Sequence, residues 1–70
     1  MEWIKCDSTA ADEFAYDGES GTLSIRFNNG SLYEYYDVPE EVFAGLLEAQ
    51  SVGRYLNDNV TSTYGYAQVG

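Results

Sequence analysis

A β-hairpin pattern in the middle of the sequence limits the folds open to this chain more than any other feature. Leu23, Ile25 and Phe27 alternate with polar residues, which is the two-residue period of a half-buried strand. The Asn-Asn-Gly sequence at 28–30 tolerates positive φ angles, and a tyrosine-rich segment over 31–38 begins a second strand. The sequence therefore predicts two antiparallel strands joined by a tight loop.

The length of that loop decides which face of the hairpin carries the tyrosines. A two-residue turn would place Glu34 on the face of Ile25. A three-residue loop, with the glycine as bulge residue, instead places Tyr33 opposite Ile25 and Tyr35 opposite Leu23. We favour the three-residue loop because the shorter turn buries a carboxylate beside an apolar row.

The segments on either side of the hairpin extend the prediction. Residues 13–17 form a short strand candidate with Phe14 and Tyr16 on one face, and 17–21 form the turn that follows it. After the hairpin, Pro39 suits the first position of a helix. The two glutamates that follow it, at 40–41, lie where the helix dipole favours negative charge. We expect one face of this helix to pack on the sheet, with the residues Val42, Phe43, Leu46, Leu47 and Gln50.

A second short helix and an ambiguous tail complete the chain. Ser51 can cap a helix that turns Tyr55, Leu56 and Val60 inward. The last segment, 61–70, reads either as an added strand or as a loose tail. The prediction is a single α+β domain over 1–70, in which a small antiparallel meander is followed by two short helices packed on one sheet face. A chain of 70 residues buries only about 60% of its unfolded surface, which excludes a deep enclosed active site.

The charge balance is strongly acidic. Twelve acids against Lys5, Arg26 and Arg54 leave a formal net charge of −9, which repels nucleic-acid backbones and anionic membranes at long range. The start of the sequence lacks the apolar stretch of a signal peptide, and no apolar run approaches the ~20 residues that cross a bilayer. We expect a cytoplasmic protein with no membrane partner.

The residue types needed for common catalysis are absent or isolated. The sequence has no histidine, which removes the usual proton shuttle and the commonest neutral metal ligand. Cys6 has no base beside it and is interpreted as an ordinary packed or edge residue. The paired carboxylates at 12–13 and 40–41 are explained by a strand entry and a helix start. We therefore predict no enzyme activity, no cofactor and no metal.

Tyrosines are the unusual component of the sequence. Three of them, Tyr33, Tyr35 and Tyr36, lie within four residues, and four more are distributed along the rest of the chain. They can fill the margin of a small core, stack on bases, or anchor a protein partner. The candidate binding surface comprises Tyr36, Tyr64, Tyr66, Arg26 and Arg54.

The order and spacing of these motifs resemble the KTSC family, with the best match over 14–64. The family's central Tyr-x-Tyr element matches Tyr33 and Tyr35, and further motif positions match Val38, Pro39, Ser51 and Gly53. The resemblance implies a domain that occurs alone in bacteria and at the C-terminus of some lysyl-tRNA synthetases. It also implies RNA binding, because of the synthetase context.

One stretch departs from the family pattern and bears on that role. Family members often carry basic residues before the final tyrosine, where this sequence has uncharged residues at 61–63. Three cations give a single-strand salt slope of only about −2. We therefore expect a small non-enzymatic interaction module that binds a protein partner or associates with itself. RNA binding is the alternative, and an acidic mimic of nucleic acid is the third hypothesis.

Overall fold

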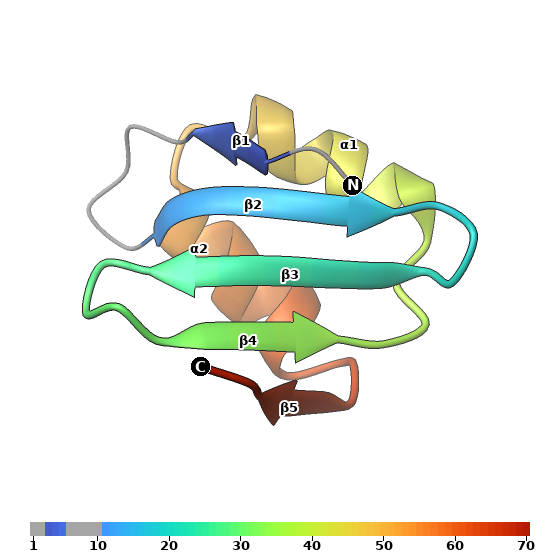
Figure 1. Cartoon of the computed structure of the whole chain (residues 1–70). Helices are drawn as coiled ribbons and strands as arrows, with labels where there is room; N and C mark the ends of the chain where they lie inside the picture. Colours follow the sequence, from blue (N-terminus) through green and yellow to red (C-terminus); the bar gives the residue numbers. More distant parts are fainter. Residues whose placement is uncertain (1–2, 6–10) are drawn as a thin grey trace.

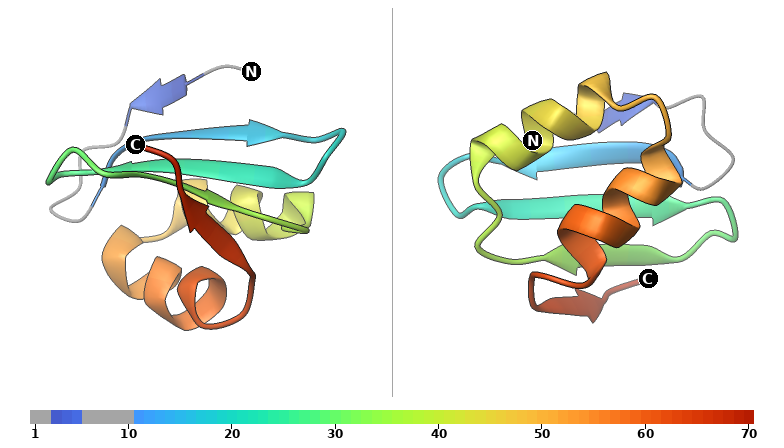
Figure 2. Two further views of the ribbon diagram at one scale, coloured as in Figure 1. Left: turned by 60° about the horizontal axis from the view of Figure 1, so that its bottom comes forward. Right: turned by 180° about the vertical axis from the view of Figure 1, so that it is seen from behind.

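The computed structural model describes residues 3–5 and 11–70, and its strands form one antiparallel sheet in sequence order (Figure 1). The strands are β1 (Trp3–Lys5), β2 (Ala11–Asp17), β3 (Thr22–Phe27), β4 (Leu32–Tyr35) and β5 (Tyr66–Gln68). The helical segments are α1 (Glu40–Glu48), α2 (Val52–Leu56) and the π-helical η1 (Asn57–Thr61). The helices cover one face of the sheet (Figure 2), which confirms the predicted α+β class. Cys6 lies outside the described residues.

The β3–β4 hairpin has the predicted three-residue loop. Its register pairs Ile25 with Tyr33 and Leu23 with Tyr35. Gly30 occupies the bulge position with a φ of 89°, a conformation that glycine adopts without steric cost. The Tyr-x-Tyr pair therefore shares the helix-covered face of the sheet, which we call the inner face.

The strand that carries these tyrosines ends earlier than the sequence predicts. β4 stops at Tyr35, although the tyrosine-rich segment was expected to run toward Val38. Asp37 has a φ of 59°, in the left-handed region that ends a regular strand. The Val38 amide then donates to the Gly21 carbonyl at 2.8 Å, which ties this connection to the β2–β3 turn.

The hydrophobic core lies between the inner face and the helices. From the sheet it takes Ala11, Phe14, Leu23, Ile25 and Tyr35, and from the helical layer and its connection it takes Val38, Leu46, Leu56 and Val60. Tyr16 and Phe43 close one side of this core with stacked rings, whose centroids are 4.9 Å apart. Burial on this scale is the main favourable term in the stability of the fold.

The predicted packing face of α1 was partly wrong. Leu46 is buried with 1% of its surface exposed, whereas Leu47 is 47% exposed and Gln50 is exposed beyond the helix end. The buried side is centred on Leu46, and its neighbour lies about 100° further round a helix of 3.6 residues per turn. The helix begins at Glu40, so that Pro39 is the N-cap rather than the first helical residue.

The C-terminal third of the structure shows how the second helix is capped and what residues 61–70 form. Ser51 caps α2 as predicted, because its hydroxyl accepts a hydrogen bond from the Arg54 amide at 3.4 Å. Leu56 and Val60 are buried as expected. Part of the segment over 61–70 is an added strand, because β5 pairs with β4. Among the described residues, no helix has the length and apolar character required to cross a membrane.

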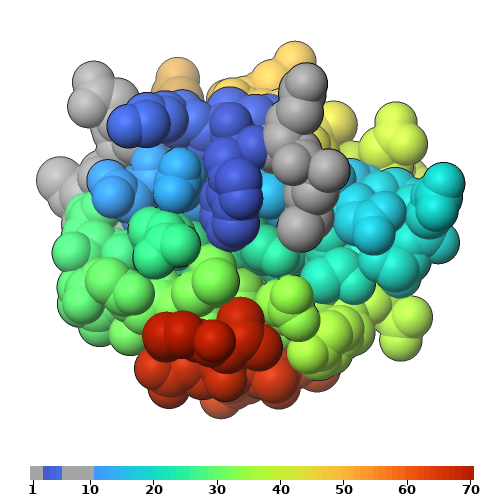
Figure 3. Space-filling view, in the orientation of Figure 1, coloured from blue at the N-terminus to red at the C-terminus, as the bar shows by residue number. Residues whose placement is uncertain are grey.

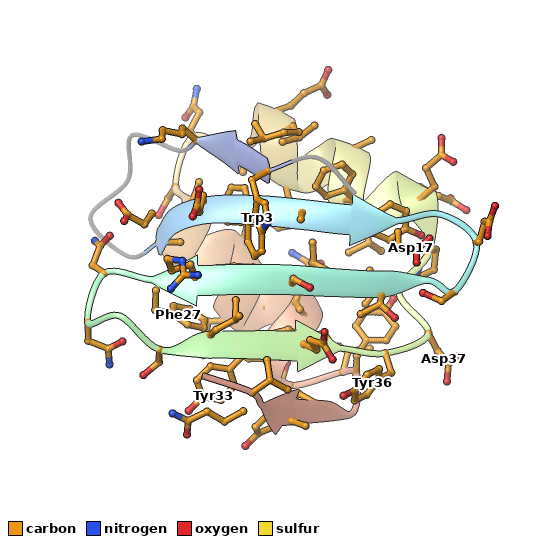
Figure 4. All side chains as sticks on the ribbon, viewed as in Figure 1. Trp3, Asp17, Phe27, Tyr33, Tyr36 and Asp37 are labelled. Atoms are coloured by element: carbon orange, nitrogen blue, oxygen red, sulfur yellow. The ribbon has the colours of Figure 1, made fainter. Side chains whose placement is uncertain are left out.

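Of the helices that the structure describes, none covers the opposite, outer face of the sheet (Figure 1), which Figure 3 shows from the front. Trp3 lies over β2 and β3 on this face (Figure 4). The Arg26 guanidinium carbon is 5.9 Å from the centroid of the indole ring, and the Arg26 side chain forms an ion pair with Glu13 at 3.2 Å. The outer face therefore carries a small cation–π and ion-pair cluster, while the rings of the Tyr-x-Tyr pair lie on the inner face.

Candidate functional site

The inner face of the sheet opens into a hollow of about 310 Å³ beside the β4–β5 edge. We call it the aromatic hollow, and it is lined by Phe27, Asn29, Tyr33, Tyr35, Thr61 and Tyr66. The antiparallel register explains how distant residues meet, because it sets Tyr66 of β5 directly against Tyr35 of β4. Phe27 and Tyr33 come from the hairpin-loop end of the sheet (Figure 4). Residues more than thirty positions apart therefore build one site.

The four rings of the hollow form a contiguous cluster. Tyr33 meets Phe27 edge-on, with centroids 5.4 Å apart and an angle of 87° between the rings. Tyr66 leans over both members of the Tyr-x-Tyr pair, at 5.7 Å from Tyr33 and 5.5 Å from Tyr35. These separations lie in the range of favourable aromatic contacts. The contacts hold the rings in place without closing the hollow.

Burial changes steeply from one side of this cluster to the other. Tyr35 is 3% exposed, Tyr33 is half-buried, and Tyr66 is 57% exposed. Burial, and then the neighbouring Tyr33 and Tyr66, raise the pKa of Tyr35, so its phenol is neutral at neutral pH. The site therefore combines a buried ring with a solvent-facing ring.

Polar groups stand at the margin of the aromatic hollow. The Tyr33 hydroxyl donates to the Gln68 side-chain oxygen at 3.4 Å. Asn29 lies in the hairpin loop, where its side-chain oxygen accepts from the Ser31 amide at 3.0 Å. Thr61 ends η1, and its hydroxyl donates to the Asn57 carbonyl at 3.4 Å. The lining residues include no Asp, Glu, Lys or Arg, so the polar atoms of the hollow come from hydroxyl and amide groups.

Sequence reasoning did not assign three of the lining residues to a site. Phe27 was interpreted as a strand residue, Asn29 as a loop residue, and Thr61 only as an uncharged departure from a family pattern. Thr61 reaches the hollow through η1, and a π-helical turn has no clear sequence signature although such turns are frequent at functional sites.

The two arginines of the predicted binding surface do not join the tyrosines. Arg26 is on the outer face in its ion pair with Glu13. Arg54 is on α2, where its side chain is 3.6 Å from Asp58 one turn further along. The structure therefore separates both cations from the aromatic hollow.

The other two predicted surface tyrosines also lie elsewhere. The Tyr36 hydroxyl donates to the Glu34 carboxylate at 3.3 Å on the outer side of the β4 end, and partial burial and the Glu34 charge raise the pKa of Tyr36. Tyr64 is half-buried against the core. Of the tyrosines singled out from the sequence as motif or surface candidates, only Tyr33, Tyr35 and Tyr66 meet in one place.

A second hollow, of about 430 Å³, lies where α1 turns into α2. We call it the helical hollow, and its lining residues are Ala49, Gln50, Ser51, Arg54, Tyr55, Asp58 and Asn59. Ser51 is occupied as a helix cap, and the Tyr55 hydroxyl donates to the Val42 carbonyl at 2.8 Å. The described part of the chain places no three His, Cys, Asp or Glu side chains where they could hold a metal ion.

Comparison with known proteins gives consistent matches. The model of the KTSC domain matches residues 7–64. A protein of Tsukamurella paurometabola is 45% identical over 51 residues, which cover 73% of this chain and 76% of the relative. A lysine–tRNA ligase of Nostoc punctiforme is 32% identical over 66 residues, which cover 94% of this chain but 12% of the ligase. The crystal structure of a KTSC domain protein from Yersinia pestis has a TM-score of 0.94 at 23% identity, covers 99% of this chain and 97% of that one, and shows the same fold.

Proposed function

This chain belongs to the KTSC domain family, and from that premise we propose that it is a non-enzymatic interaction module whose aromatic hollow binds a protein partner. The observation that carries the proposal is the arrangement of Tyr66, which is 57% exposed yet rests on the buried Tyr35 with their centroids 5.5 Å apart. A solvent-facing ring held by a rigid neighbour is the kind of anchor that dominates protein interfaces.

The energetics of tyrosine support a protein partner. A tyrosine ring buries a large area on binding and loses only two side-chain torsions, and its hydroxyl can stay hydrated at the rim. The ring contacts with Tyr33 and Tyr35 lower that entropic cost further, because they fix Tyr66 before the partner arrives. The aromatic hollow beside it has room for a side chain of the partner.

RNA is a second candidate, favoured by the match of this chain to part of a lysine–tRNA ligase. Three observations weigh against it as the main ligand. The net charge of −9 opposes a phosphate backbone, both arginines lie away from the hollow, and Tyr35 is too buried to stack on a base. We therefore rank a cytoplasmic protein partner first.

A capture experiment tests the ranking. The whole chain, immobilised, is exposed to a lysate with and without nuclease, beside the variant Tyr66→Ala and the control Tyr36→Ala. Both variants remove one half-exposed or exposed tyrosine, but only the first belongs to the aromatic hollow. We expect one protein to be retained after nuclease, to be lost with Tyr66→Ala and to be kept with Tyr36→Ala. Equal retention by both variants would contradict the role of the hollow.

The RNA candidate is tested directly by fluorescence anisotropy with labelled single-stranded RNA at two salt concentrations. One or two stacked bases supply about 1–6 kcal/mol, which the repulsive field reduces. We expect no binding tighter than roughly 100 μM for the monomer. Sub-micromolar affinity at physiological salt would reverse the ranking in favour of RNA.

A further inference from the structure

The aromatic hollow presents electron-rich ring surface with no cation beside it. Four of its lining side chains are aromatic, and three of these are tyrosines. The ring centroids are 5.4–6.4 Å apart, so a group that enters the hollow comes close to more than one ring. A cation within about 6 Å of a ring centroid is attracted by the negative ring face.

The chain's own cations leave this surface free. The described basic residues are Lys5, Arg26 and Arg54, and none of them lines the hollow. Arg26 already makes a cation–π contact, but with Trp3 on the outer face at 5.9 Å. The rings of the aromatic hollow have no such internal partner in the described part of the chain.

Charge decides between a cationic and a neutral occupant. The formal charge of −9 is carried by a molecule with extents of only 28 × 24 × 24 Å. At physiological salt the Debye length is about 8 Å, so charges farther than this from an approaching segment are largely screened, and the net charge acts most strongly at low salt. A basic segment is therefore drawn to the protein, while an acidic segment or a phosphate backbone is repelled.

The polar rim favours a guanidinium over an ammonium. The Thr61 hydroxyl uses its proton on the Asn57 carbonyl, which leaves its lone pairs open to a donor. The Asn29 side-chain oxygen accepts one amide and has a second lone pair. Guanidinium combines a planar face that stacks on rings with several N–H donors at its edge, and it is less strongly hydrated than ammonium.

We propose that the aromatic hollow binds an arginine side chain from a basic segment of the partner protein. The proposal rests on the proposed function and names the chemistry of its ligand. The guanidinium stacks on the tyrosine rings, and its edge donates to Thr61 and Asn29 at the rim.

The test compares three small probes with the whole chain by two-dimensional amide NMR. N-acetyl-arginine amide carries the cation, N-acetyl-citrulline amide is its neutral isostere, and N-acetyl-lysine amide carries an ammonium. We expect saturable shifts at Tyr33, Thr61 and Tyr66, with arginine binding at least fivefold more tightly than either other probe. Its affinity should fall as salt is raised from 20 to 300 mM, because the field of the protein is then screened.

Matched variants locate the effect. Tyr66→Leu keeps an apolar side chain of useful size at an exposed position but removes the π surface. Tyr36→Leu makes the same change on the outer side and serves as the control. We expect the preference for arginine over citrulline to disappear in the first variant and to persist in the second.

Three results would overturn the proposal. The first is equal affinity for arginine, lysine and citrulline, and the second is an arginine-induced shift pattern centred on the acidic start of α1 at Glu40 and Glu41 instead of on the hollow. The third is displacement of the arginine probe by single-stranded RNA at lower concentration. If the wild type shows no preference for arginine but lysate capture still depends on Tyr66, only the cationic ligand is refuted. If capture is unchanged in Tyr66→Ala, the proposed function itself is refuted.

Discussion

The aromatic hollow and the helical hollow use their tyrosines differently. In the helical hollow, Ser51 caps α2 and the Tyr55 hydroxyl is bound to the Val42 carbonyl. In the aromatic hollow, Tyr66 is 57% exposed, and its ring contacts those of Tyr33 and Tyr35. The residues of the helical hollow thus hold two helices together, whereas the aromatic hollow leaves ring surface exposed to solvent.

This difference divides the family motif into two parts. Ser51 and its neighbours on α2 serve the fold, because the cap satisfies a backbone amide of a very short helix. Val38 is fully buried and Pro39 is the N-cap of α1, so these positions are also structural. The Tyr-x-Tyr pair is divided between the fold and the hollow: Tyr35 belongs to the core, whereas Tyr33 packs against the core and also lines the hollow. A motif residue is therefore not by itself evidence of a binding role.

On the helical side of the comparison, the largest expected effect is the loss of a buried leucine of α1. Leu46→Ala removes a side chain that is 1% exposed and should lower the free energy of unfolding by about 2–5 kcal/mol. Leu47→Ala, one residue along and 47% exposed, should change it by less than about 1 kcal/mol. Urea denaturation of both variants measures the difference, and equal losses would mean that α1 is rotated relative to the described packing.

A second prediction concerns the seam between the helices. A Cβ atom added at Gly45 would overlap the Tyr55 hydroxyl, which is itself held by the Val42 carbonyl. Gly45→Ala should therefore cost about 1–3 kcal/mol, although alanine is the better helix former.

The double variant Gly45→Ala with Tyr55→Phe is the matched control, because it removes the oxygen that causes the overlap. We expect part of the lost stability to return, relative to Tyr55→Phe alone. If thermal denaturation shows that Gly45→Ala stabilises the protein in both backgrounds, the close approach of the helices is not what keeps glycine at this position.

The parts of the fold that the sequence predicted correctly are governed by local rules. The hairpin register followed from the cost of burying Glu34 and from the loop glycine, and the structure pairs Ile25 with Tyr33 accordingly. The Ser51 cap followed from one residue type at a helix start. Each of these depends on residues within about ten positions of one another.

The features that the sequence did not predict depend on packing between distant segments. The orientation of α1 is set by the sheet beneath it, so the apolar pattern alone did not distinguish Leu46 from Leu47. Glycine in a helix interior reads from sequence only as a weak helix former, and the fold shows that Gly45 makes room for Tyr55. The aromatic hollow likewise needs the pairing of β5 with β4, which brings Tyr66 back to Tyr35.

A smaller effect on stability is expected at alkaline pH, from the titration of the buried Tyr35 in the aromatic hollow. The pKa of Tyr35 is raised in the folded state above its ordinary value of about 10, first by burial and then by its tyrosine neighbours. The unfolded chain therefore loses this proton first, so the stability contribution is complete below about pH 10 and is lost as the pH rises through the folded pKa.

Urea midpoints at pH 8, 10 and 11 measure this dependence. We expect the midpoint to fall above pH 10, and to fall less steeply in Tyr35→Phe, which has no proton to lose at this position. Tyr16→Phe should also flatten the curve, because burial, Glu40 and Asp17 raise the pKa of Tyr16. Identical slopes in the wild type and in Tyr35→Phe would show that the phenol is not protected from titration by the fold.

The smallest expected effect on stability is at the exposed end of the same cluster. Tyr66→Ala removes a ring that is 57% exposed on a three-residue edge strand, and with it the ring contacts to Tyr33 and Tyr35. Aromatic pairs contribute about 0.5–1.5 kcal/mol each beyond burial, and at this exposure we expect a total loss near the lower limit. Tyr35→Ala, in contrast, should lower the free energy of unfolding by about 3–5 kcal/mol.

Two measurements on Tyr66→Ala, the stability by urea denaturation and the binding by partner capture, separate a structural role from a binding role. A side chain that serves binding should show a small change in the urea midpoint and a complete loss of capture. Tyr66→Phe keeps the ring and removes only the hydroxyl, so it should retain both, because the ring surface makes the contacts that we assign to this residue. A large fall in stability for Tyr66→Ala would instead place Tyr66 among the structural residues, beside Tyr35, and remove the physical distinction between the two hollows.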